Sequence, residues 1–172
     1  MRRIIVITGN GKGKTTAAIG ASIRARGRGF KVLFFQFLKS KDVDYGEHLF
    51  FAGNKKIKLE RLGLGCKKDF KYGKDDINSA LTGLSKINTA LRKERSKQVL
   101  CVIDEVSYPV NWKWFSVKEI ITLLKEHPTV SFILTGRQMP KGLVALADTV
   151  SDIKEIKHAY QKGRNAQKGI EF

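Results

Sequence analysis

The sequence predicts an α/β fold, in which a mostly parallel sheet is flanked by helices on both faces. Short aliphatic runs alternate along the chain with longer segments whose apolar residues recur every three or four positions. A glycine-rich turn follows the first aliphatic run directly, as it does in a strand–turn–helix unit. The length of 172 residues is typical of one domain, which we expect to span residues 1–172.

The first half of the chain begins with a regular strand–helix–strand pattern. The run Ile4–Thr8 reads as a buried strand, residues 15–26 as a helix that stops at Gly27, and residues 32–38 as a second strand. Their spacing fits a right-handed crossover between two parallel strands. Residues 40–75 are rich in glycine and lysine, and we expect short elements there with a mobile loop around 63–73.

The second half repeats the alternation of helices and strands. Ile77, Leu81, Leu84, Ile87 and Leu91 recur at helical spacing, and Asp75 or Asp76 can cap their helix. Ser116 and Glu119 form the capping-box pattern at the start of another helix. We therefore expect helices over 75–95, 116–126 and 141–147, and strands over 99–103, 130–134 and 150–156.

The composition excludes several classes of protein. With 42% hydrophobic and 28% charged residues, the chain falls in the globular range rather than the disordered or fibrous one. Its apolar runs are far shorter than the roughly 18 residues of a membrane span, and Ile4–Ile7 is too short for the core of a signal peptide. Two cysteines, Cys66 and Cys101, make no disulfide framework. We therefore expect a cytoplasmic protein without membrane contacts.

The formal net charge of +17 points to an anionic partner. The first 41 residues hold ten Lys or Arg and no Asp or Glu, and residues 55–74 hold another eight basic residues. A nucleotide, a nucleic acid or another polyanion would account for such an excess. A solvated basic surface is the alternative explanation.

A phosphate-binding loop is predicted between the first strand and the first helix. The pattern G-x-x-x-x-G-K-[ST] fits with Thr8 in place of the first glycine. Lys14 can reach terminal phosphates, the Thr15 hydroxyl can bind Mg²⁺, and Lys12 adds a cation. This makes the fold P-loop NTPase-like, and the expected nucleotide-binding residues are Thr8, Gly9, Asn10, Gly11, Lys12, Gly13, Lys14, Thr15 and Thr16.

Two acidic residues, Asp104 and Glu105, follow the third predicted strand. In P-loop proteins an acid at the end of another parallel strand holds Mg²⁺, directly or through water. We therefore expect a magnesium site made by Thr15 with Asp104 or Glu105. The spacing alone leaves open which of the two acids contacts the ion.

The loop and three further stretches resemble the P-loop class of ATP:corrinoid adenosyltransferases, enzymes of vitamin B12 biosynthesis and salvage. The resemblance covers residues 4–38 and about 98–172. It rests on the loop TGNGKGKTTAA at 8–18, the acidic strand end DEV at 104–106, the segment LTGR at 134–137, and the tail segments IKHAY at 156–160 and QKGIEF at 167–172.

The resemblance implies transfer of the 5′-deoxyadenosyl group of ATP to the cobalt(I) of a reduced corrinoid, with triphosphate as the leaving group. Reduced cobalt is itself the nucleophile, so the protein has to position the substrates and stabilise the departing charge. Lys12, Lys14 and Arg137 are the expected catalytic cations. The resemblance further implies Mg²⁺, a homodimer and an electron-donating reductase, whereas nucleic acid is not an expected partner.

The segment expected to contact the corrinoid departs from the pattern of the family. In the family, aromatic side chains of a glycine-rich segment, with a Trp nearby, pack against the corrin face. Here that segment is 63–72 and lacks Trp, so Phe70 or Tyr72 is the expected substitute. The alternative for either residue is an aromatic side chain that is exposed in a loop or packed in the hydrophobic core. Trp112 and Trp114 are assigned to core or surface packing, with contact to a cofactor as the alternative.

Two other functions are compatible with a phosphate loop. A nucleic-acid-stimulated P-loop ATPase would account for the positive charge, and a small-molecule kinase would have a similar size. Both would release ADP or inorganic phosphate, whereas an adenosyltransferase releases triphosphate. The phosphate product therefore separates the three hypotheses.

Overall fold

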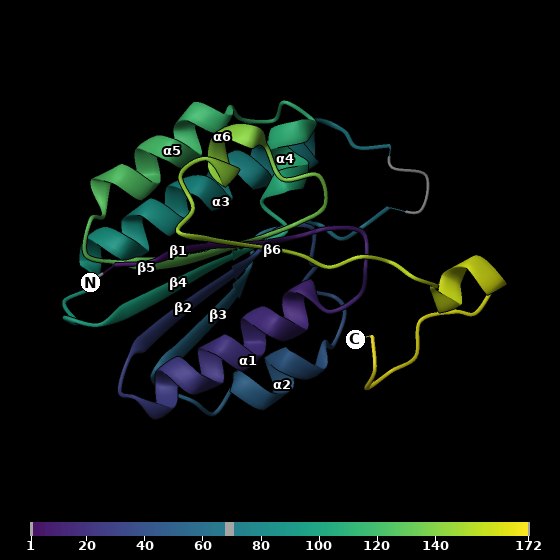
Figure 1. Ribbon diagram of the computed structural model, residues 1–172, viewed down its shortest axis with the longest axis horizontal. Coiled ribbons are helices and arrows are strands. Elements are labelled where there is room, and N and C mark those ends of the chain that lie inside the picture. Colours follow the sequence, from purple (N-terminus) through teal and green to yellow (C-terminus); the bar gives the residue numbers. More distant parts are fainter. Residues whose placement is uncertain (1, 68–70, 172) are drawn as a thin grey trace.

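The computed structural model describes residues 2–67 and 71–171 and contains a six-stranded sheet with the order β3-β2-β4-β5-β1-β6 (Figure 1). Every strand pair is parallel. The strands are β1 Ile4–Thr8, β2 Lys31–Gln36, β3 Ile57–Arg61, β4 Val99–Asp104, β5 Ser131–Thr135 and β6 Thr149–Asp152. The predicted α/β fold is thereby confirmed.

Helices cover both faces of the sheet (Figure 1). On one face lie α1 Lys14–Gly27 and α2 Gly46–Phe51, and on the other lie α3 Lys74–Lys93, α4 Ser107–Asn111, α5 Val117–Glu126 and α6 Lys141–Val144. A 3₁₀ turn, Ala159–Lys162, follows in the C-terminal tail. Within the described ranges, no helix has the length and apolar character that a membrane crossing requires.

The central strands are apolar on both sides because both faces of the sheet are covered. In β2, Val32 and Phe34 pack in the core beneath α1, while Leu33 and Phe35 pack in the larger core beneath α3 and α5. This explains the continuous apolar run in the sequence. The exception is Gln36 at the end of β2, which is fully buried although polar.

The structure refines several sequence predictions. The segment 40–75 contains α2 and the edge strand β3, whose types the sequence left open. In α3 the buried stripe includes Ala80, Gly83 and Ile87, while Leu81 is exposed. Leu81 lies about 100° around the helix from Ala80, so it faces away from the sheet. The Asp76 carboxylate accepts the Gly73 N–H at 2.8 Å and so caps α3 as expected.

The last strand is shorter than predicted. The sequence suggested residues 150–156, but β6 ends at Asp152. Beyond it the chain turns along the loop after β1, where the Ile153 N–H donates to the Thr8 carbonyl at 2.9 Å and the Ile153 carbonyl accepts the Gly11 N–H at 2.8 Å. The tail thus begins as one wall of the predicted phosphate loop.

Candidate nucleotide and corrinoid site

The loop between β1 and α1 is shaped by close contact with the chain after β6. A Cβ on Gly9 would lie 2.2 Å from the Asp152 carboxylate and 2.4 Å from the Ile153 carbonyl, so only glycine fits there. Gly13 lies directly before α1 and has a φ of 119°. This is a left-handed conformation that glycine adopts without strain. The loop therefore turns sharply and directs the N-terminus of a 14-residue helix at the space above it.

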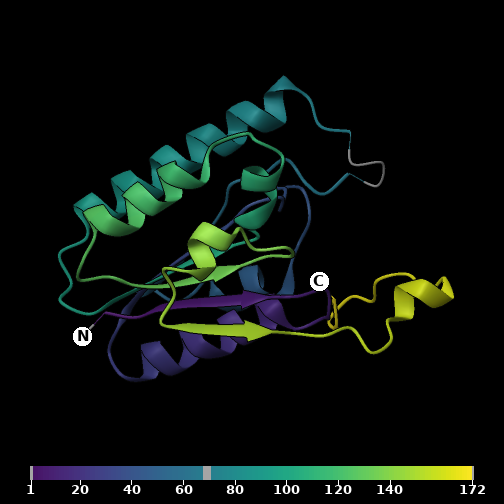
Figure 2. The ribbon, with the colours of Figure 1, turned by 45° about the horizontal axis from the view of Figure 1, so that its top comes forward.

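The two lysines of the loop have different surroundings. Lys14 is buried, with 6% of its surface exposed, and its ammonium donates to the Gly11 carbonyl at 2.8 Å. Burial lowers the pKa of Lys14, and the charge of Arg137 acts in the same direction. Lys12 is exposed and donates to the Ile170 carbonyl at 2.9 Å, with a Glu171 carboxylate oxygen at 4.0 Å. Figure 2 shows the C-terminal tail returning to this loop.

Thr15 lies directly beside the acid at the end of β4. Its hydroxyl oxygen is 3.0 and 3.2 Å from the two carboxylate oxygens of Asp104. Thr135 donates to Asp104 Oδ1 at 2.5 Å, and Gln36 Nε2 donates to Oδ2 at 3.1 Å. Asp104 is thus fully buried and held by side chains from three other elements.

Glu105 differs from Asp104 in its conformation and its hydrogen bonds. It has a φ of 59°, a left-handed conformation that is strained for a residue with a side chain. Its N–H donates to the Thr135 hydroxyl at 3.0 Å, while within the described part of the chain its buried Oε2 has no hydrogen-bond partner. Burial and the charge of Asp104 raise the pKa of Glu105 to about 7.

Arg137 and Lys39 add positive charge to the same edge of the sheet. Arg137 is exposed just after β5, next to Gly136. Both charges act on Glu105 and lower its pKa, against the effect of burial. The sequence predicted Arg137 as a site residue, but it did not single out Lys39. Asn10 and Thr16, the remaining polar residues predicted in the loop, are exposed.

The donor set suits a hard cation. One hydroxyl and one carboxylate lie 3.0 Å apart, and an unpartnered carboxylate oxygen of Glu105 is buried nearby. Oxygen ligands of this kind are those that Mg²⁺ prefers, with its other positions filled by water and phosphate. Over residues 2–67 and 71–171, no three His, Cys, Asp or Glu side chains group as a metal site. Thr15 and the two acids are therefore a fit for a nucleotide-bound ion.

An open cavity of about 670 Å³ adjoins the loop. Thr8 lines it and ties two segments together, because its hydroxyl donates to the Gly136 carbonyl at 2.9 Å and accepts the Met139 N–H at 3.3 Å. Gln138, Met139, Lys154 and Glu155 also line the cavity, so its walls are both polar and apolar. Its position beside Thr8 gives space for the part of a nucleotide that extends beyond the loop.

Four aromatic rings gather close to this edge, and we call them the aromatic cluster: Tyr72, Tyr108, Trp112 and Trp114. The Trp112 ring centroid is 4.5 Å from that of Tyr72 and 5.1 Å from those of Tyr108 and Trp114. All four are partly buried and pack against the core. The Tyr108 N–H donates to the Glu105 carbonyl at 3.3 Å, so the cluster adjoins the acidic pair. Phe70, the other predicted corrin-face residue, lies outside the described residues.

Sequence reasoning missed the side chains that hold Asp104. Gln36 was visible as a lone polar residue in an apolar run, and Thr135 as the first residue after one. Behind Gln36, the Glu47 carboxylate accepts its amide N–H at 3.1 Å and the His48 ring donates to its amide oxygen at 3.1 Å. These contacts join residues far apart in the sequence, so no local pattern reveals them.

Comparisons with known proteins point to one family. A family model described as ATP:corrinoid adenosyltransferase BtuR/CobO/CobP matches residues 1–172. The chain is 34% identical over 170 residues to a corrinoid adenosyltransferase of Escherichia coli K12, covering 98% of this chain and 85% of that one. It is 32% identical over 170 residues to corrinoid adenosyltransferase CobA of Salmonella typhimurium, with the same coverage. A corrinoid adenosyltransferase of Pseudomonas aeruginosa is 30% identical over 171 residues, or 98% and 83% of the two chains.

Proposed function

Since the chain belongs to the ATP:corrinoid adenosyltransferase family, we propose that its loop 8–16 holds the triphosphate of the substrate ATP. As a member of this family, the chain transfers the adenosyl group of ATP to the cobalt of a corrinoid in vitamin B12 biosynthesis. The observation that carries this assignment is the contact between Thr15 and Asp104 at 3.0 Å. It joins the phosphate loop after β1 to the acid at the end of β4, as a site for a nucleotide with its cation requires.

The chemistry asks the protein mainly to position two substrates. Cobalt(I) attacks the 5′ carbon of ATP, the cobalt–carbon bond forms, and the bond from that carbon to the triphosphate oxygen breaks with its electron pair. Backbone N–H groups of the loop, Lys14 and Lys12 would stabilise the charge on the departing triphosphate. Arg137 is exposed on the same edge and would add a third cation.

Thr15 and Asp104 would hold Mg²⁺, with Glu105 close enough to act directly or through water. The ion would supply charge stabilisation for the triphosphate oxygens. Asp104 is fixed by Thr135 and Gln36 before any ligand arrives, so its carboxylate needs little reorganisation. This preorganisation is what a charge-stabilising site requires.

The aromatic cluster is our proposed surface for the corrin face. Tyr72 supplies one ring from the predicted glycine-rich segment, and Trp112 and Trp114 bring in the tryptophans that the segment lacks. A half-buried group of flat apolar rings suits a flat macrocycle and would exclude a water ligand from cobalt. Its position beside Glu105 would place the corrin next to the nucleotide.

The phosphate product tests the assignment. The protein is incubated with Mg²⁺, ATP and chemically reduced cobalamin, and the products are separated by anion exchange. We expect triphosphate in equal amount to a light-sensitive cobalt–carbon product. ADP as the phosphate product, without triphosphate, would identify a kinase or an ATPase instead.

We also propose a homodimer, an electron-donating reductase as partner, and a cytoplasmic location. Leu49 and Phe50 on α2 are 61% and 73% exposed, an apolar surface that a second copy could cover. Cys66 and Cys101 are free thiols, which suits a reducing compartment. We further propose that residues 1–172 act as one domain, since one continuous sheet includes strands from both halves of the chain.

A further inference from the structure

The buried amide of Gln36 connects the acid at the end of β4 to the start of α2. Gln36 ends β2 and is fully buried. Its amide nitrogen donates to Asp104 Oδ2 and to Glu47 Oε1, both at 3.1 Å, and its amide oxygen accepts a hydrogen bond from His48 Nε2 at 3.1 Å. The proposed nucleotide site accounts for the contact with Asp104, but it leaves the contacts with Glu47 and His48 unexplained.

These three contacts fix which end of the Gln36 amide faces Asp104. An ionised carboxylate only accepts hydrogen bonds, so the amide nitrogen has to face Asp104 and Glu47, and the amide oxygen then faces the ring of His48. If the amide turned over, its oxygen would lie against two carboxylates. Turning it over would thus break three hydrogen bonds, whereas it would break one if Asp104 were the only partner. Glu47 and His48 therefore lock the orientation that Asp104 needs.

The ring of His48 is neutral when it makes this contact. Burial lowers the pKa of His48 to about 4, and the charge of Arg61 acts in the same direction. The ring is therefore neutral near pH 7 and has one N–H. Since the Gln36 oxygen has no hydrogen to donate, that N–H lies on Nε2. His48 thus orients the amide without adding a positive charge that would repel a cation at Asp104.

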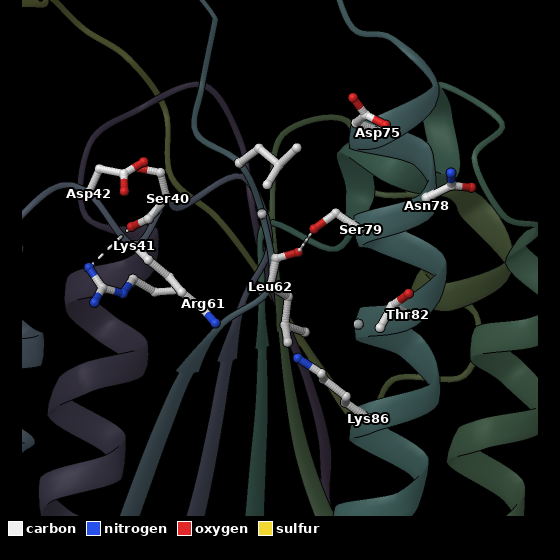
Figure 3. A pocket seen from close by; sticks show the side chains of 13 residues that line it. Ser40, Lys41, Asp42, Arg61, Leu62, Asp75, Asn78, Ser79, Thr82 and Lys86 are labelled. Atoms are coloured by element: carbon white, nitrogen blue, oxygen red, sulfur yellow. Dashed lines mark hydrogen bonds between the residues drawn. The ribbon is translucent and has the colours of Figure 1, made fainter.

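The segment that leads into α2 is itself fixed. The Arg61 guanidinium at the end of β3 donates to the carbonyl oxygens of Ser40 at 3.1 Å and Val43 at 2.6 Å. Figure 3 shows the contact with Ser40 at the wall of a surface groove. Lys39 Nζ lies 3.9 Å from the centre of the Tyr45 ring, directly before α2. The first turn of α2 therefore meets the sheet in a defined position.

The side of α2 that contacts β2 is largely polar. Phe51 is buried in the core. Leu49 and Phe50 are 61% and 73% exposed, whereas Glu47 and His48 are only partly exposed and contact β2. In a surface helix the side toward the core is usually apolar, and a local departure from that pattern is expected where a polar contact has a function.

We propose that Glu47 and His48 are positioning residues of the magnesium site, which they serve by holding the Gln36 amide. The amide in turn fixes the Asp104 carboxylate, and the oxygen that accepts its N–H also lies 3.2 Å from the Thr15 hydroxyl. Removing a group that orients a metal ligand commonly weakens metal binding. The inference rests on the proposed function, in which ATP binds with Mg²⁺ at Thr15 and Asp104.

The Mg²⁺ dependence of ATP binding tests this role without any corrinoid. We measure the Kd for ATP by calorimetry in excess EDTA and in saturating Mg²⁺, and take the ratio of the two values as the Mg²⁺ effect. Gln36→Leu should reduce this effect about tenfold, the lower end of what is usual for a group that orients a metal ligand. Glu47→Leu and His48→Phe should each reduce it about threefold, as expected for one hydrogen bond. The Kd in EDTA should stay at the wild-type value, whereas damage to the fold would weaken binding in both conditions.

Three further variants separate the hydrogen bonds from charge and from the fold. The double variant with Gln36→Leu and Glu47→Leu should lose no more than Gln36→Leu alone, since Glu47 acts through the amide. Glu47→Gln removes the charge but keeps an acceptor oxygen, and it should stay within about twofold of wild type. Asp44→Leu is the matched control, because it removes an exposed carboxylate from the segment before α2, and it should keep the full Mg²⁺ effect. Thermal midpoints should show that all the variants are folded.

The inference is overturned, with ATP binding by the wild type still dependent on Mg²⁺, if Glu47→Leu and His48→Phe keep the full Mg²⁺ effect. A further loss from Glu47→Leu in the Gln36→Leu background would also overturn it, because the effect would then bypass the amide. An equal loss in Glu47→Gln would assign the effect to charge instead. If Mg²⁺ does not strengthen ATP binding by the wild type, the magnesium site itself is wrong, and if the wild type does not bind ATP, so is the proposed function.

Discussion

Replacing Lys14 with methionine should remove most of the transfer activity and leave the nucleotide-free fold almost as stable as before. Methionine has a similar length but no charge, so it keeps the packing of a side chain that is only 6% exposed. It loses the hydrogen bond of the ammonium to the Gly11 carbonyl at 2.8 Å. The variant therefore separates what Lys14 does for the fold from what it does for the ligand.

Two opposing terms set the stability of this variant. A hydrogen bond from a charged donor contributes about 1.5–3 kcal/mol. Against this, burial lowers the pKa of Lys14, which means that the folded protein holds the charged form at a cost near pH 7. We expect the terms to cancel to within about 1 kcal/mol, and such a change shifts the thermal midpoint of a chain of this size by roughly 2–4 °C.

The effect on catalysis should be far larger. A fixed group that stabilises charge developing in the transition state typically contributes about 10²–10³ in kcat, or roughly 2.7–4 kcal/mol. The assay is the initial rate of cobalt–carbon bond formation with reduced cobalamin at saturating ATP. Lys97→Met, just before β4 at the opposite edge of the sheet, is the control and should react at the wild-type rate. A rate for Lys14→Met within about threefold of wild type would refute the assignment of the phosphate loop.

Three further predictions address the acids and the dimer. Asp104→Asn should lower the free energy of unfolding in urea by about 1–3 kcal/mol, because the new amide N–H would face the donors Thr135 and Gln36. The variant should also need a higher Mg²⁺ concentration for activity, and an unchanged Mg²⁺ requirement would contradict our magnesium site. The pKa of Glu105 is raised from 4.5 to about 7, so this carboxyl destabilises the fold progressively as the pH rises from about 4.5 through 7. Glu105→Gln should therefore be more stable than wild type by about 3 kcal/mol at pH 8, and about as stable as wild type at pH 4.5. If the urea midpoints of the two proteins differ by the same amount at both pH values, this reasoning is wrong. Phe50→Glu should convert a dimer to a monomer in light scattering while the chain stays folded, and a persistent dimer would place the interface elsewhere.

Local patterns predicted much of the fold. The apolar run that ends in glycine gave β1 with its observed bounds, Ile4–Thr8. The pair Ser116 and Glu119 predicted the start of α5, and the structure contains that capping box, with the Glu119 N–H donating to the Ser116 hydroxyl at 3.3 Å. Both features depend on neighbours within a few residues, so the sequence contains the information needed to find them.

The parts that the sequence did not resolve depend on distant contacts. In β3 the pattern Ile57-Lys-Leu-Glu-Arg61 alternates weakly and is rich in charge, and the strand is formed by pairing with β2 at the sheet edge. Tyr72 meets Trp112 only because the loop before α3 and the turn after α4 lie at the same edge. The order of the strands in the sheet determines which distant residues come into contact, and no local sequence pattern specifies that order.

The net charge of +17 acquires a different meaning once the strands are placed. Lys31 begins β2, Lys55 and Lys56 precede β3, and Lys97 precedes β4, so these cations lie at the amino edge of a parallel sheet. That edge is about 20 Å from the phosphate loop along a six-residue strand, more than two Debye lengths at physiological salt.

Charges at that distance contribute little to ATP binding, or to docking of the reductase that we propose, if the cobalt is bound at the aromatic cluster on the other edge. Changing Lys31, Lys55, Lys56 and Lys97 to Gln should therefore leave the KM for ATP and the KM for the corrinoid within about twofold of wild type, since each charge is screened over that distance. A large rise in the KM for ATP in that variant, at physiological salt, would show that the basic edge acts on the nucleotide after all. The lysines that we propose for catalysis are then the few at the carboxyl edge, where Lys12 and Lys14 lie in the predicted phosphate loop.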